Sequence, residues 1–289
     1  MGYLGHKRLI ALVALFVVSG SCGGVLSDGT STLTSGPLAI SSPWRGIGVA
    51  DDPVECPDVT SLDVSWYYNW WHETTCGDND AEFVAMVWGD ECATVETCRA
   101  VLGQSTVKLP RPSVLLGFNE PDLATQANMT VGRAIELWPA LESTGLSLGS
   151  PATTWTDSGR VWTDSFMTQV GQLGHRVDFI AMHWYGPCSD IEGLMTAVDH
   201  YRRYQRPIWI TEFSCLGGTV SETSNFISQS MTRLAEDPDV ERVSWFSTRP
   251  YASAERYGAL HTSDGRQNLA GLAYAAIEPC RRSLRASPC

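Results

Sequence analysis

Short apolar runs separated by helix-length stretches recur along this chain, and this rhythm is the feature that most constrains its fold. Most of the runs are continuously apolar rather than alternating, a pattern typical of parallel strands that are covered on both faces. The predicted strands are, in order, Gly46–Ala50, Asp63–Asn69, Phe83–Trp88, Val114–Phe118, Ser147–Ser150, Phe179–Trp184, Ile208–Phe213 and Val243–Ser247.

Helical patterns occupy most of the stretches between these strands. The predicted helices cover residues 94–103, 130–143, 163–173, 190–204, 221–236 and 267–277. The first two connections are too short or too polar to indicate clear helices. Alternating strands and helices predict an α/β fold, and eight strands indicate a single-domain (β/α)8 barrel, the TIM barrel.

A doubly wound open sheet is the alternative α/β architecture. That fold usually carries a glycine-rich phosphate-binding turn after its first strand. Here the first predicted strand leads into Asp51-Asp52-Pro53 instead, which favours the barrel.

Residues 1–21 have the pattern of a secretory signal peptide. Lys7 and Arg8 precede the apolar run Leu9–Val18, and small residues follow it. The run is too short to span a bilayer, which requires about 20 residues. An uncleaved anchor and a lipid-modified Cys22 are the alternatives. We expect a protein that is secreted to the extracellular space or cell wall and is not inserted in a membrane after cleavage. Residues 22–42 would form a flexible mature N-terminus, and 43–289 the barrel.

Nine cysteines are present, and eight remain if the signal peptide is cut after Cys22. An even number of cysteines in a secreted chain indicates disulfide bonds, although the sequence does not determine their pairing. Cys188–Cys215 and Cys280–Cys289 are the pairs we expect. A structural zinc site is disfavoured because the sequence contains no Cys-x-x-Cys and its histidines are scattered.

The net charge of −12 argues against nucleic acid or an anionic membrane as the main partner. Hydrophobic residues make up 43% of the chain and charged residues 18%, which is a globular composition. The sequence therefore favours a folded secreted domain, which we expect to be a monomer.

Two glutamates lie where predicted strands end, which is where barrel enzymes place their active sites. Glu120 follows the fourth predicted strand, and Glu212 lies at the end of the seventh. A lone carboxylate buried there is costly unless it is paired or used. We expect the two to face each other across the barrel mouth. Such a pair suits glycoside hydrolysis, in which one carboxyl group donates a proton and the other attacks the anomeric carbon. We expect neither a cofactor nor a metal ion, because side chains supply both functions.

Aromatic residues, 10% of the chain, cluster near the predicted strand ends. A pyranose ring has an apolar face that stacks on aromatic rings and a rim of hydroxyls that binds polar groups. For Trp70 and Trp184, which stand where strands stop, exposure to the cleft is expected, whereas barrel filling is the alternative for Trp245. The predicted substrate-binding residues are Asn119, Tyr68, Asn69, Trp70, Trp88, His183, Trp184, Tyr185 and Trp245.

Five segments in order carry a resemblance to glycoside hydrolase family 128. They are Trp66-Tyr67-Tyr68-Asn69-Trp70, Met86-Val87-Trp88-Gly89, Gly117-Phe118-Asn119-Glu120-Pro121-Asp122, His183-Trp184-Tyr185-Gly186 and Ile210-Thr211-Glu212-Phe213. The resemblance extends from about Arg45 to Ile277. The family consists of secreted β-1,3-glucanases in the clan of retaining barrel glycosidases, also described as the alkali-sensitive-linkage glycosyl hydrolase core.

The resemblance implies a role for each matching residue. Glu120 would be the acid/base and Glu212 the nucleophile. Asn119 would bind the sugar 2-hydroxyl, and Tyr185 would hydrogen-bond the nucleophile.

The sequence thus predicts a retaining endo-β-1,3-glucanase acting on β-glucan polysaccharide or oligosaccharide. A barrel glycosidase acting on β-1,4-glucan, mannan or xylan is one alternative, and a catalytically silent glucan-binding protein is another. A serine hydrolase is less favoured, since no Gly-x-Ser-x-Gly is present. Asn128-Met129-Thr130 is an acceptor sequence for N-glycosylation.

Overall fold

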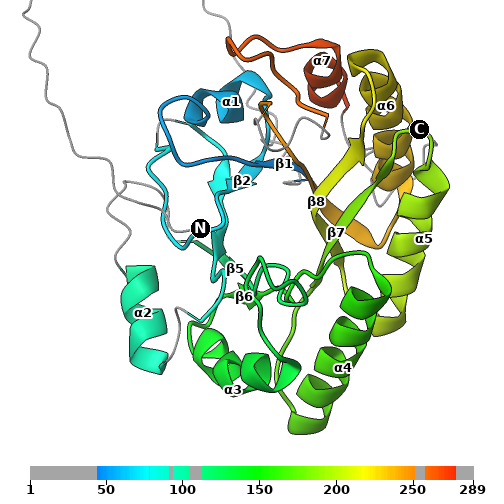
Figure 1. Cartoon of the computed structure of the whole chain (residues 1–289). Helices are drawn as coiled ribbons and strands as arrows, with labels where there is room; N and C mark the ends of the chain where they lie inside the picture. Colours follow the sequence, from blue (N-terminus) through cyan, green and yellow to red (C-terminus); the bar gives the residue numbers. More distant parts are fainter. Residues whose placement is uncertain (1–43, 78, 91–93, 104–111, 251–257, 278–289) are drawn as a thin grey trace, which may run out of the picture. The chain divides into compact units, whose positions relative to one another are not determined.

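The computed structural model describes residues 44–77, 79–90, 94–103, 112–250 and 258–277. Parallel strands alternate with helices along this part of the chain (Figure 1). The strands are β1 Arg45–Gly48, β2 Trp66–Tyr68, β3 Glu82–Phe83, β4 Ala85–Met86, β5 Val114–Leu116, β6 Ser147–Leu148, β7 Ile180–Pro187, β8 Ile208–Leu216 and β9 Val240–Trp245. The helices are α1 Cys56–Ser61, α2 Val95–Gly103, α3 Val131–Glu142, α4 Asp157–Leu173, α5 Ile191–Tyr201, α6 Val220–Glu236 and α7 Leu269–Ala275, with a 3-10 turn η1 at Arg202–Tyr204.

The strands form two parallel sheets, ordered β3-β2-β1-β9-β8-β7 and β4-β5-β6. Only Val84 separates β3 from β4, so this segment pairs with β2 on one side and with β5 on the other. At the second junction, Gly149 bridges Phe179 in parallel, and the Ser150 amide donates to the Phe179 carbonyl at 3.0 Å. Backbone pairing therefore continues from each sheet to the other at both junctions. The predicted α/β fold of parallel strands and helices is confirmed.

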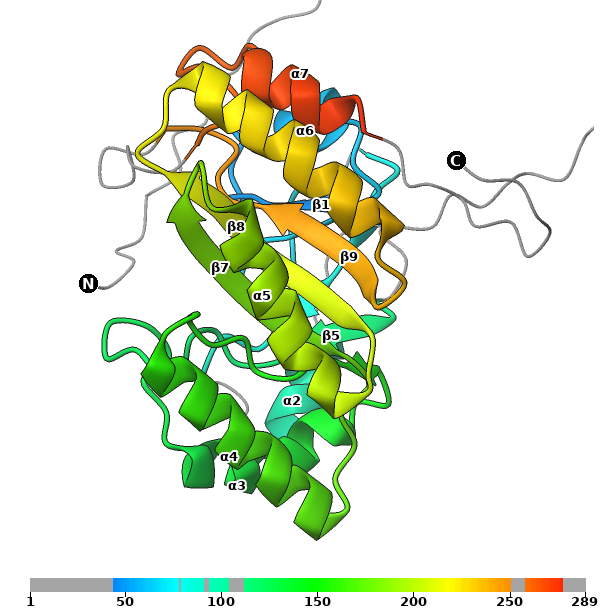
Figure 2. The same ribbon diagram turned by 90° about the vertical axis from the view of Figure 1, so that its right-hand side faces the viewer.

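Each of the longer helices begins at a side chain that accepts a backbone hydrogen bond. Thr130, Thr156, Asp190 and Thr219 are the N-cap residues of α3, α4, α5 and α6. Thr219 and Glu222 form a reciprocal capping box. The helices α5 and α6 lie across the outer side of β7, β8 and β9 (Figure 2). Each predicted helix has a counterpart, although α4 begins earlier than predicted and the short α1 was not predicted.

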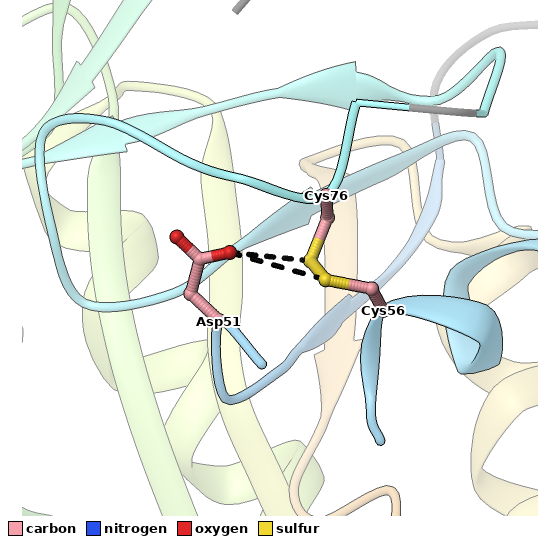
Figure 3. A group of neighbouring side chains, drawn as sticks. All are labelled: Asp51, Cys56 and Cys76. Carbon is pink, nitrogen blue, oxygen red and sulfur yellow. Dashed lines mark hydrogen bonds between the residues drawn. A yellow bond between two sulfur atoms is a disulfide. The ribbon is translucent and has the colours of Figure 1, made fainter. Parts of the chain in front are cut away.

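Two disulfides are present among the described residues. Cys188–Cys215 was predicted and is confirmed; it joins the ends of β7 and β8, with Cα atoms 4.6 Å apart. Cys56–Cys76 was not predicted and joins the start of α1 to the segment after β2 (Figure 3). The pair Cys280–Cys289 lies outside the described residues. Within those residues, no helix has the length and apolar character required to cross a membrane.

We expect the Cys188–Cys215 bond to be a substantial source of stability. Its two cysteines are 27 residues apart, and closing a loop of this size removes unfolded-state entropy equivalent to about 3.5 kcal/mol. Replacing both cysteines by alanine should lower the free energy of unfolding in urea by about that amount. An unchanged unfolding midpoint would contradict this prediction.

Candidate active site

The structure brings Glu120, His183 and Glu212 together from three strand ends. Glu120 follows β5, His183 lies in β7 and Glu212 lies in β8. One carboxylate oxygen of each glutamate and a ring nitrogen of His183 lie within 4.8 Å of one another. All three side chains are buried, with Glu120 8% and Glu212 6% exposed. The structure therefore places two carboxyl groups and one imidazole in a single buried cluster.

The backbone at Glu120 is in the left-handed region, with φ +40°. This conformation costs a non-glycine residue about 1 kcal/mol or more, and such residues cluster at functional sites. Two backbone hydrogen bonds hold it: the Glu120 amide donates to the Ala152 carbonyl at 2.7 Å, and the Leu123 amide donates to the Glu120 carbonyl at 3.0 Å. The fold thus fixes the direction of the Glu120 side chain.

Three donors converge on the carboxylate of Glu212. The Tyr185 hydroxyl donates to Oε2 at 2.5 Å, while Trp70 Nε1 and the Tyr68 hydroxyl donate to Oε1 at 2.7 and 3.2 Å. Hydrogen bonds donated to a carboxylate stabilise its charged form. The arrangement suits an anionic Glu212 that is held in one orientation.

His183 lies between the two glutamates. Its Nδ1 is 3.0 Å from Glu120 Oε1 and 3.5 Å from Glu212 Oε2. Complete burial acts to lower the pKa of His183, but the charge of Glu212 and the hydrogen bond and charge of Glu120 outweigh burial and raise it above its usual value. Burial and the Glu212 charge raise the pKa of both Tyr68 and Tyr185 well above normal, so both hydroxyls stay protonated as donors.

The raised pKa of His183 predicts a pH-dependent contribution to stability. The extra stabilisation is fully present at a pH below the pKa of His183 in the unfolded chain, which is near 6.5. It is lost as the pH rises through the higher pKa of His183 in the folded protein. His183→Gln should therefore destabilise the protein more at pH 5.5 than at pH 8.5. Urea unfolding of both proteins at the two pH values measures this difference. A loss of stability that is the same at both pH values would contradict the prediction.

Two tryptophans predicted to bind substrate do not line the site, and these predictions were wrong. Trp184 is 1% exposed and stacks on Phe226 of α6 at 5.6 Å between ring centroids. Trp245 is fully buried and packs against Phe213 and Tyr274. Successive side chains of a strand point to opposite faces. Since His183 and Tyr185 face the glutamates, Trp184 must face the helices.

Two other predicted substrate-binding residues, Tyr68 and Asn69, form hydrogen bonds with protein groups where contacts to a sugar were expected. Tyr68 is fully buried, and its single hydroxyl hydrogen is shared between the Thr211 carbonyl at 2.9 Å and Glu212 Oε1 at 3.2 Å. Asn69 accepts from the Trp71 amide and donates to Asp51 Oδ2 and the Glu73 carbonyl, so its whole amide group is engaged within the loop after β2. These two side chains organise the site and do not present free groups to a sugar.

Three of the predicted substrate-binding residues lie where they could contact a substrate. Trp70 and Trp88 are half-buried beyond the ends of β2 and β4. Asn119 is buried beside Glu120, and its Nδ2 donates to Gln126 Oε1 at 3.3 Å. Asn119 Oδ1 and His183 Nε2 have no hydrogen-bond partner among the described residues. A sugar hydroxyl could satisfy these two atoms.

Among the residues that the structure describes, two side-chain groups have a composition that could hold a metal ion. Asp51, Cys56 and Cys76 form the first (Figure 3), but the two cysteines are joined in a disulfide and have no thiolate to coordinate with. Glu120, His183 and Glu212 form the second. Both oxygens of Glu212 already accept hydrogen bonds from protein donors, an arrangement that fits an orienting role better than metal coordination.

The sequence model of the glycosyl hydrolase catalytic core family matches residues 46–274. The chain belongs to this family. The matched region contains the whole of the site described above. A curated relative of this glycosyl hydrolase is alkali-sensitive linkage protein 1 of Schizosaccharomyces pombe, which is 30% identical over 226 residues. The match covers 73% of this chain but only 40% of the relative, so the chain spans less than half the length of that protein.

Solved structures of glycoside hydrolase family 128 resemble this glycosyl hydrolase over most of its length. A subgroup I endo-β-1,3-glucanase from Amycolatopsis mediterranei, a mutant in complex with laminaripentaose, is 32% identical with a TM-score of 0.70. The match covers 81% of this chain and 99% of the Amycolatopsis chain. A subgroup III curdlan-specific exo-β-1,3-glucanase from Blastomyces gilchristii, in complex with glucose, is 25% identical with a TM-score of 0.66, covering 82% and 99%. The protein is a glycoside hydrolase, and the predicted resemblance to family 128 is confirmed.

Proposed function

We propose that this protein is a retaining endo-β-1,3-glucanase that uses Glu212 as nucleophile and Glu120 as acid/base. The observation that carries the proposal is the separation of at most 4.8 Å between an oxygen of each carboxylate. Retaining glycosidases hold their two carboxyl groups about 5–5.5 Å apart, whereas inverting enzymes need roughly 6.5–9.5 Å to accommodate a water molecule.

The hydrogen bonds around the two glutamates support this division of roles. Three donors stabilise a negative charge on Glu212, as a nucleophile requires. In the first step, a Glu212 oxygen attacks the anomeric carbon while Glu120 transfers its proton to the glycosidic oxygen. The bond between that carbon and the leaving oxygen breaks, which leaves a glycosyl ester on Glu212 and a free hydroxyl on the departing chain.

The second step reverses these movements with water. Glu120, now ionised, removes a proton from a water molecule whose oxygen attacks the anomeric carbon. The ester bond breaks, Glu212 regains its charge and Glu120 regains its proton. Two inversions at one carbon give a product with the configuration of the substrate.

The solved relatives support β-1,3-glucan as the substrate. They include endo-β-1,3-glucanases of subgroup I, from Amycolatopsis mediterranei at 32% identity, and subgroup II, from Sorangium cellulosum at 28% identity, and the exo-β-1,3-glucanase of subgroup III at 25%. We infer endo action from the first two. The half-buried Trp70 and Trp88 offer an aromatic surface for the sugar, and Asn119 Oδ1, which has no hydrogen-bond partner among the described residues, offers an acceptor.

A linkage-defined panel tests this proposal. We expect reducing sugar to be released from laminarin and curdlan but not from carboxymethylcellulose, mannan or xylan. Early products should be oligosaccharides of mixed length, since an endo enzyme cuts internal bonds. Glucose as the sole early product would show exo action, and preferential cleavage of a β-1,4-linked glycan would contradict the substrate class. Binding of glucan without turnover would indicate a silent binding protein.

We also propose that the protein is secreted and acts at the cell wall or outside the cell. The two disulfides are typical of an oxidising compartment, and residues 1–21 have the pattern of a signal peptide. Full-length protein expressed in a secreting host should appear in the medium, with a new N-terminus near Cys22. Retention in the cell with Met1 intact would contradict this.

A further inference from the structure

We propose that Asp51 is a positioning residue for catalysis, which closes the loop after β2 and thereby holds the Trp70 indole against Glu212. This inference rests on the proposed function, because it concerns how the nucleophile of that reaction is oriented. Asp51 follows β1 and, unlike Trp70, makes no hydrogen bond with either catalytic glutamate.

The Asp51 carboxylate receives hydrogen bonds from both ends of one loop. At the start of the loop, Asn69 Nδ2 donates to Asp51 Oδ2 at 3.1 Å. At its end, the Thr75 amide donates to Oδ1 and Oδ2 at 2.8 and 2.9 Å, and the Thr75 hydroxyl donates to Oδ1 at 2.7 Å. One side chain thus ties together two positions that flank Trp70 and the residues after it.

The loop that Asp51 closes contains Trp70, which has a strained backbone conformation and contacts the nucleophile Glu212. Trp70 has φ +60°, in the left-handed region that a bulky side chain rarely adopts. Its Nε1 donates to Glu212 Oε1 at 2.7 Å. A conformation of this kind persists only where surrounding contacts impose it. The Trp71 amide bond to Asn69 Oδ1 and the Asn69 bond to Asp51 are the nearest such contacts along the chain.

The Cys56–Cys76 disulfide anchors the end of the same loop beside Asp51. Figure 3 shows the carboxylate directed toward the two sulfur atoms, with Oδ1 3.4 Å from Cys76 Sγ and 3.9 Å from Cys56 Sγ. Sulfur atoms in a disulfide carry no hydrogen, so these are packing contacts and not hydrogen bonds. The disulfide sets where the loop ends, and Asp51 sets how its two ends are held together.

The adjacent Asp52 offers a matched control. It has the same charge and chemistry, but its Oδ1 accepts from the amides of Val54 and Glu55, both at 2.8 Å, in the turn before α1. Replacing either aspartate by asparagine removes one negative charge from the same part of the protein. Only the Asp51 change removes acceptor capacity from the loop that carries Trp70, because an amide has a single acceptor oxygen.

The test compares Asp51→Asn, Asp52→Asn and Trp70→Phe in laminarin hydrolysis. Trp70→Phe deletes a hydrogen bond to a charged group and should lower kcat about 10- to 100-fold. We expect Asp51→Asn to lower kcat about 10-fold with little change in KM, and Asp52→Asn to remain within about 2-fold of the wild type. Combining Asp51→Asn with Trp70→Phe should cost little beyond Trp70→Phe alone, since both act through one hydrogen bond.

The division of the effect between kcat and KM distinguishes positioning of the nucleophile from direct contact with the sugar. A change in kcat with KM unchanged indicates a disturbed nucleophile, whereas a lost sugar contact would raise KM. We expect Asp51→Asn to lower kcat at unchanged KM, in the same direction as Trp70→Phe.

Hydrogen exchange of residues 69–77 provides a readout that needs no substrate. Exchange should accelerate in Asp51→Asn and not in Asp52→Asn. If Asp51→Asn does not fold, Thr75→Val removes one donor to the same carboxylate and should give the same changes with a smaller magnitude.

The proposal is overturned if Asp51→Asn matches Asp52→Asn in kcat and exchange. It is also overturned if the losses of kcat from Asp51→Asn and Trp70→Phe are independent, so that the double variant shows their product, or if Asp51→Asn raises KM alone. A wild type inactive on every glucan would refute the proposed function, whereas the exchange result would still test the loop.

Discussion

Glu212→Ala should abolish glucan hydrolysis, with kcat reduced at least about 1,000-fold, because the proposed nucleophile, which would form the covalent bond to the sugar, is gone. The truncation also leaves a space next to the anomeric carbon. Azide or formate is small enough to enter that space and attack in place of the lost carboxylate. With a substrate that carries an activated leaving group, azide should restore turnover and give an α-glycosyl azide, since a single attack inverts the anomeric centre.

An exposed glutamate provides the control for this experiment. Glu136 lies on α3 with its side chain 69% exposed, and Glu136→Ala should retain wild-type turnover. The Glu212→Ala protein should still bind laminari-oligosaccharides, because the residues proposed to contact the sugar, Trp70, Trp88 and Asn119, are unchanged. A β-glycosyl azide from this variant, or wild-type turnover without azide, would show that Glu212 is not the nucleophile.

Glu120→Ala should have an effect that depends on the leaving group. Natural glucan needs a proton on its departing oxygen, so its turnover should fall at least about 100-fold, within the range ascribed to general acid catalysis. An aryl glycoside with a leaving group of low pKa needs no such proton, and the glycosyl ester on Glu212 should still form. The ester then accumulates, because no base activates the water.

Azide distinguishes this variant from Glu212→Ala. It needs no general base, so it should release the accumulated ester as a β-glycosyl azide after two inversions. A β-azide from Glu120→Ala together with an α-azide from Glu212→Ala would assign both roles. The opposite pair of products would reverse the assignment.

Much of the fold was predictable because the strands are continuous apolar runs. The run Ile208–Phe213 could be recognised as a buried strand without knowing its neighbours, and it corresponds to β8. The start of α4 was harder to predict because Asp157, Ser158 and Gly159 are polar or small and carry no apolar periodicity. The structure shows that the Thr156 side chain sets this start by capping the helix.

The proximity of Glu120 and Glu212 followed from topology. Carboxyl ends of parallel strands in a barrel lie at the same face, so residues far apart in sequence meet there. Trp184 was placed wrongly because the sequence shows that neighbouring strand residues face opposite sides but not which side faces the site. Once His183 is assigned to the glutamates, alternation places Trp184 among the helices.

The partners of Asp51 were not predictable from the sequence. Its hydrogen bonds reach Asn69 and Thr75, which lie beyond α1 and β2. An aspartate after a strand is consistent with a turn, a sugar contact or a long-range tie. Only the path of the chain decides among these roles, and the same holds for the pairing of Cys56 with Cys76.

The anomeric form of the first product tests the two-glutamate mechanism most directly. Proton NMR of a fresh laminari-oligosaccharide digest, recorded before mutarotation, resolves the α and β signals of the new reducing end. We predict that the β signal grows first and the α signal follows only as mutarotation proceeds. Initial growth of the α signal would contradict the account, because a single inversion requires water, and not Glu212, to attack the sugar.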